Sequence, residues 1–494
     1  MAARAIAVYL AERQRPDGSF PGPDNYGTAF ALWLWSYFGT DFSRSVERAW
    51  QRFKDAPPRS HGEFNIYALL QCRDILGRAP IHALIRRLRP GARHSANWML
   101  LRAACDFQNG AFLPSLSARL EGRAALIRYA RSGFIHDRSN VRSFGYHAFC
   151  GALLADIWRS RRLTWAGRAA MEAARFLSEF ILPNGDALYV GRGQEQIFGY
   201  GALMYLLEAA RLMTGDQRYR KLSDRVFVRL TEFQRRDGSL PLVLREGEEP
   251  EPWQPDARRP GWYTYNCYAD YLPFFACMLL KASDVDLAPL DGMRPLPLHP
   301  DFQVIERERY TAVLSRPGGS PTNDLPFPYV CLQGTSIFPC YGREGDQIDP
   351  EAVALPYGVL ATGGSYGFRD HLHYRFVEDG LIGESSDVRH IRRFEFRENV
   401  FECSDEIEFR RRMTFRSFVP ANFLFRTLRA IDGTQFETWH REEKAILKME
   451  PAAAIRPDAA VSASGSLVAL RHEIPNLSAE RHQTVSTRLK VAFP

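Results

Sequence analysis

Residues 144–158 read FGYHAFCGALLADIW, and residues 198–210 read FGYGALMYLLEAA. Each stretch is long enough for about four helical turns and is apolar on almost every side. A helix that is apolar all round must be buried, so both segments are predicted to be inner helices. Their shared Phe-Gly-Tyr opening indicates two copies of one repeating unit.

Four more apolar stretches of this kind lie in the first 281 residues, and more polar stretches with a helical period alternate with them. The apolar ones are YGTAFALWLWSYF at 26–38, FNIYALLQC at 64–72, ANWMLLRAAC at 96–105 and YNCYADYLPFFACMLL at 265–280. The polar ones are 2–13, 43–54, 80–89, 117–131, 164–180 and 217–233. This alternation predicts an (α/α)6 toroid of six helical hairpins, with the apolar helices, including Trp33 and Tyr37, inside. An open superhelical solenoid is the alternative, and the end of the repeat at a change in composition favours the closed ring.

The character of the sequence changes near residue 285, where Pro becomes frequent and the helical period ends. Beyond this point, short segments rich in β-branched and aromatic residues alternate polar and apolar positions between Gly, Asp, Asn or Pro. The sequence therefore predicts an α+β chain with a toroid at 1–284, a Pro-rich linker at 285–300 and an antiparallel β domain at 301–494. A double-layer β-sandwich is favoured over a barrel.

Composition bounds the class of protein. A chain of 494 residues exceeds one ordinary hydrophobic core, and 45% hydrophobic with 24% charged residues is typical of globular proteins. The longest apolar run is far shorter than the roughly 20 residues that span a bilayer, so no membrane insertion is expected. A net charge of +7, carried largely by Arg, suits an anionic partner. No nucleic-acid-binding motif is present, so an acidic saccharide is favoured over nucleic acid.

The N-terminus and the cysteines bear on the compartment. Arg4 and the charged cluster from Glu12 leave no apolar core for an export signal, which predicts a cytoplasmic protein. A periplasmic or secreted location remains the alternative if an export signal has been removed. None of the eight cysteines forms a CxxC pair, so they are interpreted as reduced packing residues and no cofactor or metal is predicted. The oligomeric state is left open.

A toroid of six hairpins followed by an antiparallel β-sandwich resembles the polysaccharide lyases of the heparinase II/III, alginate lyase and chondroitin lyase type. The resemblance covers almost the whole chain at the level of architecture. It implies a carbon–oxygen lyase of the EC 4.2.2 class that cleaves a uronate-containing polysaccharide by β-elimination. In these families Asn or Gln, His, Tyr and often Arg lie at the mouths of the inner helices, and loops of the β domain close over the groove.

Elimination requires a group that neutralises the C5 carboxylate, a base that removes the adjacent proton and an acid that protonates the leaving oxygen. The sequence SNVRSFGYH at 139–147 is the densest cluster of suitable residue types, at the start of the fourth inner helix. We expect Arg142, Tyr146 and His147 to be catalytic and Asn140 to bind substrate. A helix cap, a buried aromatic residue and a hydrogen-bonded core histidine are the structural alternative.

The equivalent points on other inner helices supply further candidates. On the fifth, Tyr200 is predicted to be equivalent to Tyr146 and catalytic, beside the substrate-binding residues Arg192, Gln194 and Gln196. On the sixth, Tyr265 is predicted to be catalytic and Trp262, Tyr263 and Asn266 to bind substrate, although aromatic packing is the commoner use of such residues. Asn97 and Trp98 form a possible subsite on the third. Asn65, His61 and His94 are weaker candidates at the second and third helices.

The β region offers two more binding candidates, His371 and His373, which are expected to share one strand face and reach toward substrate. A zinc site there lacks an evident third ligand. A basic run that includes Arg389, Arg392 and Arg393 either guides a polyanion or forms cross-strand ion pairs with nearby Glu residues.

Two rival functions remain open from the sequence. The toroid also resembles glycoside hydrolases, including unsaturated glucuronyl hydrolases, which act through paired carboxylates. The acidic residues expected near the inner mouths are Asp24, Glu63, Asp186, Glu195 and Asp270. The mouths are otherwise dominated by Tyr, Asn, His and Arg, which favours elimination. A non-catalytic carbohydrate-binding protein is the third possibility.

Overall fold

The computed structural model describes two compact units, a helical unit and a sheet unit. It describes residues 2–88, 90–91, 94–110, 112–138, 141–191, 193–244, 253, 267–290, 299–316, 327–332, 335–338, 355–425, 428–440, 443–450, 455–462, 465–475, 477–479 and 483–494. Most of the first 298 residues form the helical unit. Residues 299–494 form the sheet unit, together with Val141, Arg142 and the segment 182–191.

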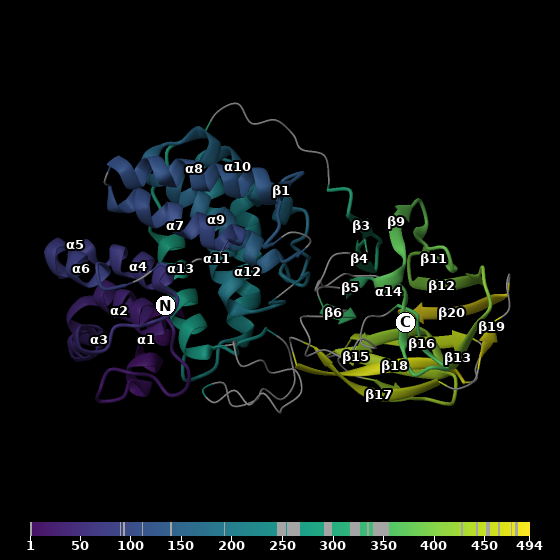
Figure 1. The fold of residues 1–494 in the computed structure, drawn as a ribbon. Helices are drawn as coiled ribbons and strands as arrows, with labels where there is room; N and C mark the ends of the chain where they lie inside the picture. Colours follow the sequence, from purple (N-terminus) through teal and green to yellow (C-terminus); the bar gives the residue numbers. More distant parts are fainter. Residues whose placement is uncertain are drawn as a thin grey trace. The chain divides into compact units, whose positions relative to one another are not determined.

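The helical unit contains an inner and an outer set of helices (Figure 1). The inner helices are α2 (Gly27–Phe38), α4 (Gly62–Gln71), α7 (Ala96–Asn109), α9 (Phe144–Arg161), α11 (Ile197–Thr214) and α13 (Tyr268–Ser283). The outer helices are α1 (Ala2–Arg13), α3 (Ser43–Asp55), α6 (Arg78–Ile85), α8 (Phe112–Tyr129), α10 (Thr164–Ser178) and α12 (Gln217–Phe233). Shorter elements are η1 (Gly39–Phe42), α5 (Arg73–Leu76) and the hairpin β1 (Ala130–Arg131) and β2 (Phe134–Ile135).

The inner helices form a closed ring. Each packs against the next along the chain, and α13 packs against α2, so the last inner helix meets the first. In Figure 1 the purple N-terminal helices accordingly lie beside teal α13. The predicted toroid is confirmed, and the open solenoid is wrong, because a solenoid leaves its two terminal repeats apart.

Burial follows the apolar pattern of the sequence, with one exception at a helix end. Trp33 exposes 6% of its surface, as expected for an inner helix. Tyr37 exposes 45%, so its predicted inner position is wrong. Tyr37 lies in the last turn of α2, where its ring contacts the neighbouring Phe38 edge-on and no further turn of α2 covers it.

The sheet unit contains three antiparallel sheets. The eight-stranded sheet has the order β14 (Arg429–Ala430), β15 (Gln435–His440), β16 (Glu443–Glu450), β20 (Thr484–Ala492), β12 (Val400–Phe409), β11 (Val388–Phe396), β10 (Gly380–Glu384) and β9 (His373–Val377). The six-stranded sheet has the order β17 (Ile455–Ser462), β18 (Gly465–Pro475), β13 (Met413–Phe425), β7 (Tyr357–Leu360) and β8 (Ser365–Gly367), with β19 (Ser478–Ala479) on β13. The four-stranded sheet is β3 (Phe302–Glu306), β4 (Tyr310–Ser315), β5 (Tyr329–Leu332) and β6 (Thr335–Phe338).

The two larger sheets pack face to face, which confirms the predicted sandwich. Phe409 of β12 contacts Phe415 and Phe418 of β13 at ring-centroid distances of 5.8 Å. Along β20, exposed and buried residues alternate, because successive side chains of a strand point to opposite faces. Within the described ranges, no helix combines the length and apolar character needed to span a membrane.

Candidate active site

The first turns of the inner helices meet at one end of the ring, which we call the mouth. Each inner helix contributes an aromatic residue there, and these residues form one cluster: Tyr26, Phe64, Trp98, Tyr146, Phe198 and Tyr271. Tyr26 stacks on Phe64 with ring centroids 4.5 Å apart. Phe198 contacts Tyr146 at 5.7 Å and Tyr271 at 5.4 Å. Apart from the partly exposed Tyr146, these rings expose no more than 7% of their surfaces, so they pack mainly on one another.

Tyr146 and His61 are the least buried polar aromatics of the mouth, and both are partly exposed. His61 contacts Tyr26 at 5.7 Å and Trp98 at 5.4 Å between ring centroids. Its backbone adopts φ 53°, in the left-handed region that non-glycine residues seldom occupy. Such strain concentrates at functional sites, so His61 is a stronger candidate than its sequence position indicated.

Three phenol groups converge on the mouth. Burial raises the pKa of Tyr26 well above its usual value, and Asp270, Tyr271 and Tyr146 add to the increase through their negative forms. Tyr26 is therefore a neutral hydroxyl at physiological pH. Tyr146, which is partly exposed, is the phenol best placed to meet a ligand.

The start of α2 is held by a carboxylate of α13. Asp270 Oδ1 accepts hydrogen bonds from the backbone N–H groups of Asn25 (2.9 Å), Tyr26 (2.8 Å) and Gly27 (2.8 Å). Burial, followed by repulsion from Asp24, raises the pKa of Asp270 to about 7. Burial also raises the pKa of Asp24, whose Oδ2 accepts a 2.5 Å hydrogen bond from Thr28 Oγ1. The mouth thus holds two carboxyl groups that retain protons more readily than ordinary Asp residues.

Two asparagines at the mouth have different surroundings. Asn65 Nδ2 donates to the carbonyl oxygens of Asn25 (2.9 Å) and His61 (3.0 Å). Asn65 Oδ1 is buried and has no hydrogen-bond partner within the part of the chain that the structure describes. Asn97 Oδ1 accepts from Ser95 Oγ and from the backbone N–H of Trp98, so it stabilises the start of α7.

The predicted equivalence of Tyr146 and Tyr200 is wrong. Phe144 packs outward against Phe176 and Phe180, whereas Phe198 packs inward against Phe64 and Tyr271. The two Phe-Gly-Tyr sequences therefore face opposite ways on their helices. Because two residues turn a helix by about 200°, Tyr146 faces the mouth and Tyr200 faces away from it. Tyr200 has no exposed surface, which removes the basis for its catalytic role.

His147 is a core residue in this structure. Its side chain has no exposed surface, and its Nδ1 accepts a 3.0 Å hydrogen bond from the backbone N–H of Ile135. Its ring packs against Phe134 and Phe176, on the side of α9 that faces the outer helix α10. This arrangement matches the structural alternative and does not support the predicted catalytic role of His147.

Arg142 is committed to an ion pair inside the sheet unit. Its Nη2 lies 2.8 Å from Asp301 Oδ2, its Nη1 donates to Ser315 Oγ at 3.0 Å, and its guanidinium lies over the Phe302 ring. It exposes only 5% of its surface. Its predicted role as a free carboxylate-binding group is wrong, because its donors already serve protein acceptors.

The loop before α11 lies next to Tyr146. Gly193 is flanked by Gln196 Oε1 and the Tyr146 ring, and its φ of 71° suits glycine. Gln194 and Gln196 are both buried, and the backbone of Gln196 pairs with Val243. Glu195 is also fully buried and has a left-handed φ of 55°. The structure thus places Gln196 at the edge of the mouth, where it is buried, and its contact with substrate stays a prediction.

Several predicted site residues lie outside the described residues: Asn140, Arg192, Trp262, Tyr263, Tyr265 and Asn266. Two of the acidic candidates have other partners. Glu63 Oε1 accepts from the Gly91 N–H at 2.7 Å and from Arg102. Asp186 belongs to the sheet unit, where it accepts a 2.9 Å hydrogen bond from the Tyr329 hydroxyl. Of the other three, Glu195 is fully buried in the loop before α11, and Asp24 and Asp270 form the carboxyl pair at the mouth.

His371 and His373 do not share a strand face. His371 ends the short helix α14 (Phe368–His371) and stacks on Tyr366 at 4.2 Å, whereas His373 begins β9. Both are exposed, and their contact with substrate stays a prediction. No set of three or more His, Cys, Asp or Glu side chains suited to a metal occurs within the described ranges.

The basic run of the β region forms ion pairs, as one of its two interpretations predicted. Arg392 binds Asp405 across β11 and β12 with Nε–Oδ1 and Nη2–Oδ2 distances of 2.6 and 2.8 Å. His390 Nε2 lies 3.0 Å from the same carboxylate. All three are buried, so this network stabilises the sheet and is not available to a polyanion.

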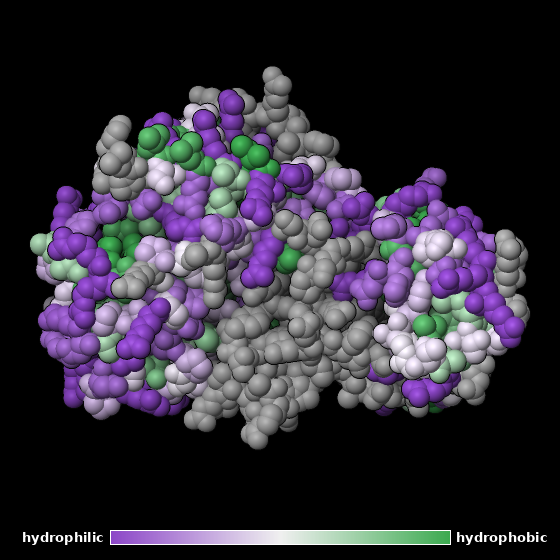
Figure 2. Space-filling view, viewed as in Figure 1, coloured by the Kyte–Doolittle hydropathy of each residue, from purple (hydrophilic) through white to green (hydrophobic). Residues whose placement is uncertain are grey.

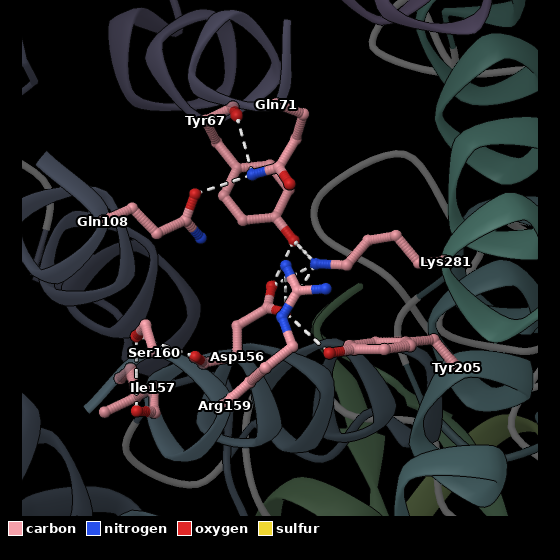
Figure 3. A network of polar contacts seen from close by, with 9 residues as sticks. All are labelled: Tyr67, Gln71, Gln108, Asp156, Ile157, Arg159, Ser160, Tyr205 and Lys281. Carbon is pink, nitrogen blue, oxygen red and sulfur yellow. Dashed lines mark hydrogen bonds and ion pairs between the residues drawn. The ribbon is translucent and has the colours of Figure 1, made fainter. Parts of the chain in front are cut away.

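A second polar network crosses the ring nearer the C-terminal ends of the inner helices (Figure 3). Lys281 Nζ of α13 lies 2.5 Å from both carboxylate oxygens of Asp156 of α9 and 2.7 Å from the Tyr67 hydroxyl. Tyr205 donates to Asp156 at 2.7 Å, and Tyr67 also donates to it. Burial lowers the pKa of Lys281 to about 8. This network ties α4, α9, α11 and α13 together and was not anticipated from the sequence.

Sequence reasoning also missed the roles of Tyr26, Phe198 and Tyr271. The entry of each apolar stretch through an aromatic residue or Asn was the available signal. This signal did not show which of several neighbouring aromatic residues faces the axis of the ring. An error of one residue in the predicted start of a helix rotates every side chain by about 100° around that helix.

No protein-family model and no curated protein sequence matches this chain. Solved structures similar to it include a heparinase III gene product, at 11% identity over 99% of this chain and 84% of that chain, with a TM-score of 0.36. A heparan sulfate lyase mutant from Pedobacter heparinus has 10% identity over 100% of this chain and 83% of that chain, with a TM-score of 0.31. A cellobiose 2-epimerase from Bacillus thermoamylovorans has 11% identity over 55% of this chain and 95% of that chain, with a TM-score of 0.43. The expected resemblance to heparinase-type lyases is thus found, but similarity at this level identifies no reaction.

Proposed function

We propose that this protein cleaves a uronate-containing acidic polysaccharide by β-elimination at the mouth of the inner ring. The observation that carries the proposal is the convergence of Tyr146, His61 and the aromatic cluster at that end. Tyr146 and His61 supply two partly exposed groups that can transfer protons, next to the packed aromatic cluster.

The helices themselves favour an anionic substrate. Each α-helix carries a partial positive charge at its N-terminus, and the six inner helices present this end to the mouth. A carboxylate placed there is stabilised by the helix dipoles. This stabilisation makes the C5 proton of a bound uronate more acidic.

In the proposed reaction, one of the pair Tyr146 and His61 removes the C5 proton as the bond between C4 and the leaving oxygen breaks. The electron pair forms a double bond between C4 and C5, and the other member of the pair protonates the leaving oxygen. The products are an unsaturated uronate at one new end and a saturated sugar at the other. No water is consumed, which distinguishes this step from hydrolysis.

Hydrolysis of an acidic oligosaccharide is the second candidate, and one observation favours it. Asp24 is partly exposed and Asp270 is buried at the mouth, and burial raises the pKa of each, as a general acid requires. Against this, Asp270 exposes 1% of its surface, and its Oδ1 is occupied by three backbone N–H groups. Elimination uses two partly exposed groups, Tyr146 and His61.

The test is incubation of the full chain with a panel of uronate-containing polysaccharides while ultraviolet absorbance and reducing ends are followed together. Elimination produces the conjugated 4,5-unsaturated uronate, so both signals rise in equal molar amounts. Reducing ends without absorbance would establish hydrolysis and overturn elimination. Binding with neither signal on any polymer would establish a non-catalytic binding protein and also overturn the proposal.

A further inference from the structure

The outer helix α8 exposes several large aliphatic side chains to solvent. Its packed face carries mostly small residues beside Tyr129: Ala118 and Ala125 are fully buried, and a Cβ on Gly122 would lie only 2.7 Å from the Trp165 ring. Leu126 is half-buried, whereas three other large aliphatic residues lie outside. Leu116, Leu120 and Ile127 expose 51%, 66% and 78% of their surfaces. An ordinary surface helix of a globular protein buries its large apolar residues, so this exposure calls for an explanation.

The three exposed aliphatic residues share one face of α8. At about 100° per residue, positions 116, 120 and 127 fall within about 40° of one another around the helix. Single exposed apolar residues are normal on protein surfaces, whereas a contiguous patch marks an interaction site. Figure 2 shows hydrophobic atoms of this kind gathered over α8, beside hydrophilic ones.

Arginines border this aliphatic stripe on both sides. Arg119 lies about 60° to one side of Leu116, Arg128 about 80° to the other side of Leu120, and Arg123 within about 20° of Leu116, between Leu120 and Ile127 along the helix. All three are exposed. None of the three forms an ion pair within the described part of the chain. Glu121, the one acidic residue of α8, is bound to Arg102 at 2.6 Å. The stripe and its border therefore form a cationic, aliphatic surface, which we call the α8 face.

We propose that the α8 face docks on the surface of an anionic lipid bilayer. Leu116, Leu120 and Ile127 enter the boundary between headgroups and acyl chains, and the three arginines bind the lipid phosphates. A cationic helix with an apolar stripe is the arrangement that lies in the plane of a membrane interface. This inference is independent of the proposed function at the mouth.

Charge and polarity favour an anionic bilayer over two other ligands of the α8 face, a second copy of the chain and an acidic polysaccharide. A second copy of the chain would bring two cationic α8 faces together, which is electrostatically unfavourable. An acidic polysaccharide complements the arginines but offers no acyl phase for three aliphatic side chains. An anionic bilayer complements both components of the face.

The test is sedimentation of the full chain with vesicles of phosphatidylcholine, with and without phosphatidylglycerol. Wild type is expected to sediment with anionic vesicles and not with neutral ones, and to dissociate as salt shortens the Debye length. The double variant Leu120→Ser/Ile127→Ser should lower the partition coefficient at least tenfold, because two aliphatic insertions are lost. The triple variant Arg119→Gln/Arg123→Gln/Arg128→Gln should lower it about a hundredfold, at about fivefold per arginine.

Val228→Ser provides the matched control, because Val228 is another exposed aliphatic residue, with 59% of its surface exposed, on the outer helix α12. It should leave vesicle binding unchanged. All substituted side chains are exposed, and thermal unfolding of each variant verifies that the fold is intact. Binding to neutral vesicles as strong as to anionic ones, or equal loss in the Val228→Ser control, would overturn the proposal. So would a dimer that the double variant dissociates, in the absence of vesicle binding.

Discussion

At the scale of single residues, the direction of a side chain decides its role. Tyr146 and Tyr200 follow identical dipeptides, yet only Tyr146 contacts the aromatic cluster, through Phe198. We expect Tyr146→Phe to lower turnover of the best polyanion by about two to four orders of magnitude, the usual range for loss of an acid or base. Tyr200→Phe should retain turnover within about tenfold, because Tyr200 is fully buried. Equal losses in both variants, measured as initial rates with the fold intact, would contradict this assignment.

His61 gives a second prediction at this scale. It contacts Tyr26 and Trp98 at the mouth, whereas His147 lies against Phe134 in the core. His61→Gln should reduce turnover at least a hundredfold, because the glutamine amide cannot exchange a proton at neutral pH. His147→Gln serves as the comparison, and any loss of turnover there should accompany a loss of thermal stability. A variant His61→Gln with wild-type turnover would remove His61 from the mechanism.

The polar network of Asp156, Lys281, Tyr67 and Tyr205 gives a third prediction, which concerns stability. Burial alone would raise the pKa of Asp156, but the charges of Lys281 and Arg159, together with hydrogen bonds from Lys281 and Tyr205, outweigh it, and the pKa is lowered. Asp156→Asn leaves the Lys281 ammonium buried without its counter-charge, so urea unfolding should show a loss of about 3–5 kcal/mol. The double variant Asp156→Asn/Lys281→Met should lose less than Asp156→Asn alone, because it also removes the buried ammonium. A double variant that loses more than the single variant would show that the pair does not act as a unit.

At the scale of elements, the start of α2 depends on a carboxyl group of α13. The pKa of Asp270 is about 7, above its ordinary value of 3.8. Between these values the folded protein holds a proton that the unfolded chain releases, so the contribution of Asp270 to stability is full below pH 3.8 and is lost as the pH rises through 7. Asp270→Asn removes this titration, and its Oδ1 can still accept the backbone N–H groups. Its free energy of unfolding relative to wild type should therefore rise between about pH 4 and pH 8, and a constant difference would contradict the assignment.

The elements themselves were largely predictable. Apolar stretches such as 144–158 correspond to inner helices, because a helix apolar on every side has no stable position outside a core. The alternation of exposed and buried residues along β20 was likewise predictable from the alternation of polar and apolar residues in its sequence. The His371 region was not, because the residues before β9 form the helical turn α14, and strand periodicity cannot reveal a turn of four residues.

The candidate site was less predictable than the elements that carry it. Tyr146 and Gln196 lie within a turn of a helix start, so their positions near the mouth could be predicted, while their roles stay predictions. The ion pair of Arg142 could not be predicted, because its partner Asp301 is 159 positions away in the sequence and belongs to the sheet unit. An ion pair between residues so far apart leaves no local pattern.

At the scale of the whole molecule, the ring closes where α2 meets α13. A Cβ on Gly27 would lie 1.8 Å from the Ala269 carbonyl oxygen, so only glycine allows this approach. Gly27→Ala should lower the free energy of unfolding by about 1–3 kcal/mol in urea, the usual cost of overpacking. Gly433→Ala is the control, because a Cβ there meets no atom within 4 Å, and it should be near neutral. A Gly27→Ala variant with the free energy of unfolding of wild type would show that α2 and α13 can move apart without a loss of stability.

The most direct test measures whether the protein catalyses β-elimination and whether that reaction depends on Tyr146. Wild type and Tyr146→Phe are each incubated with the best uronate polymer, and unsaturated uronate and reducing ends are measured in the same samples. Wild type is expected to give equal molar amounts of both products, and Tyr146→Phe is expected to lose nearly all of both, with thermal stability unchanged. Reducing ends without unsaturated uronate, or undiminished unsaturated product from Tyr146→Phe, would contradict it.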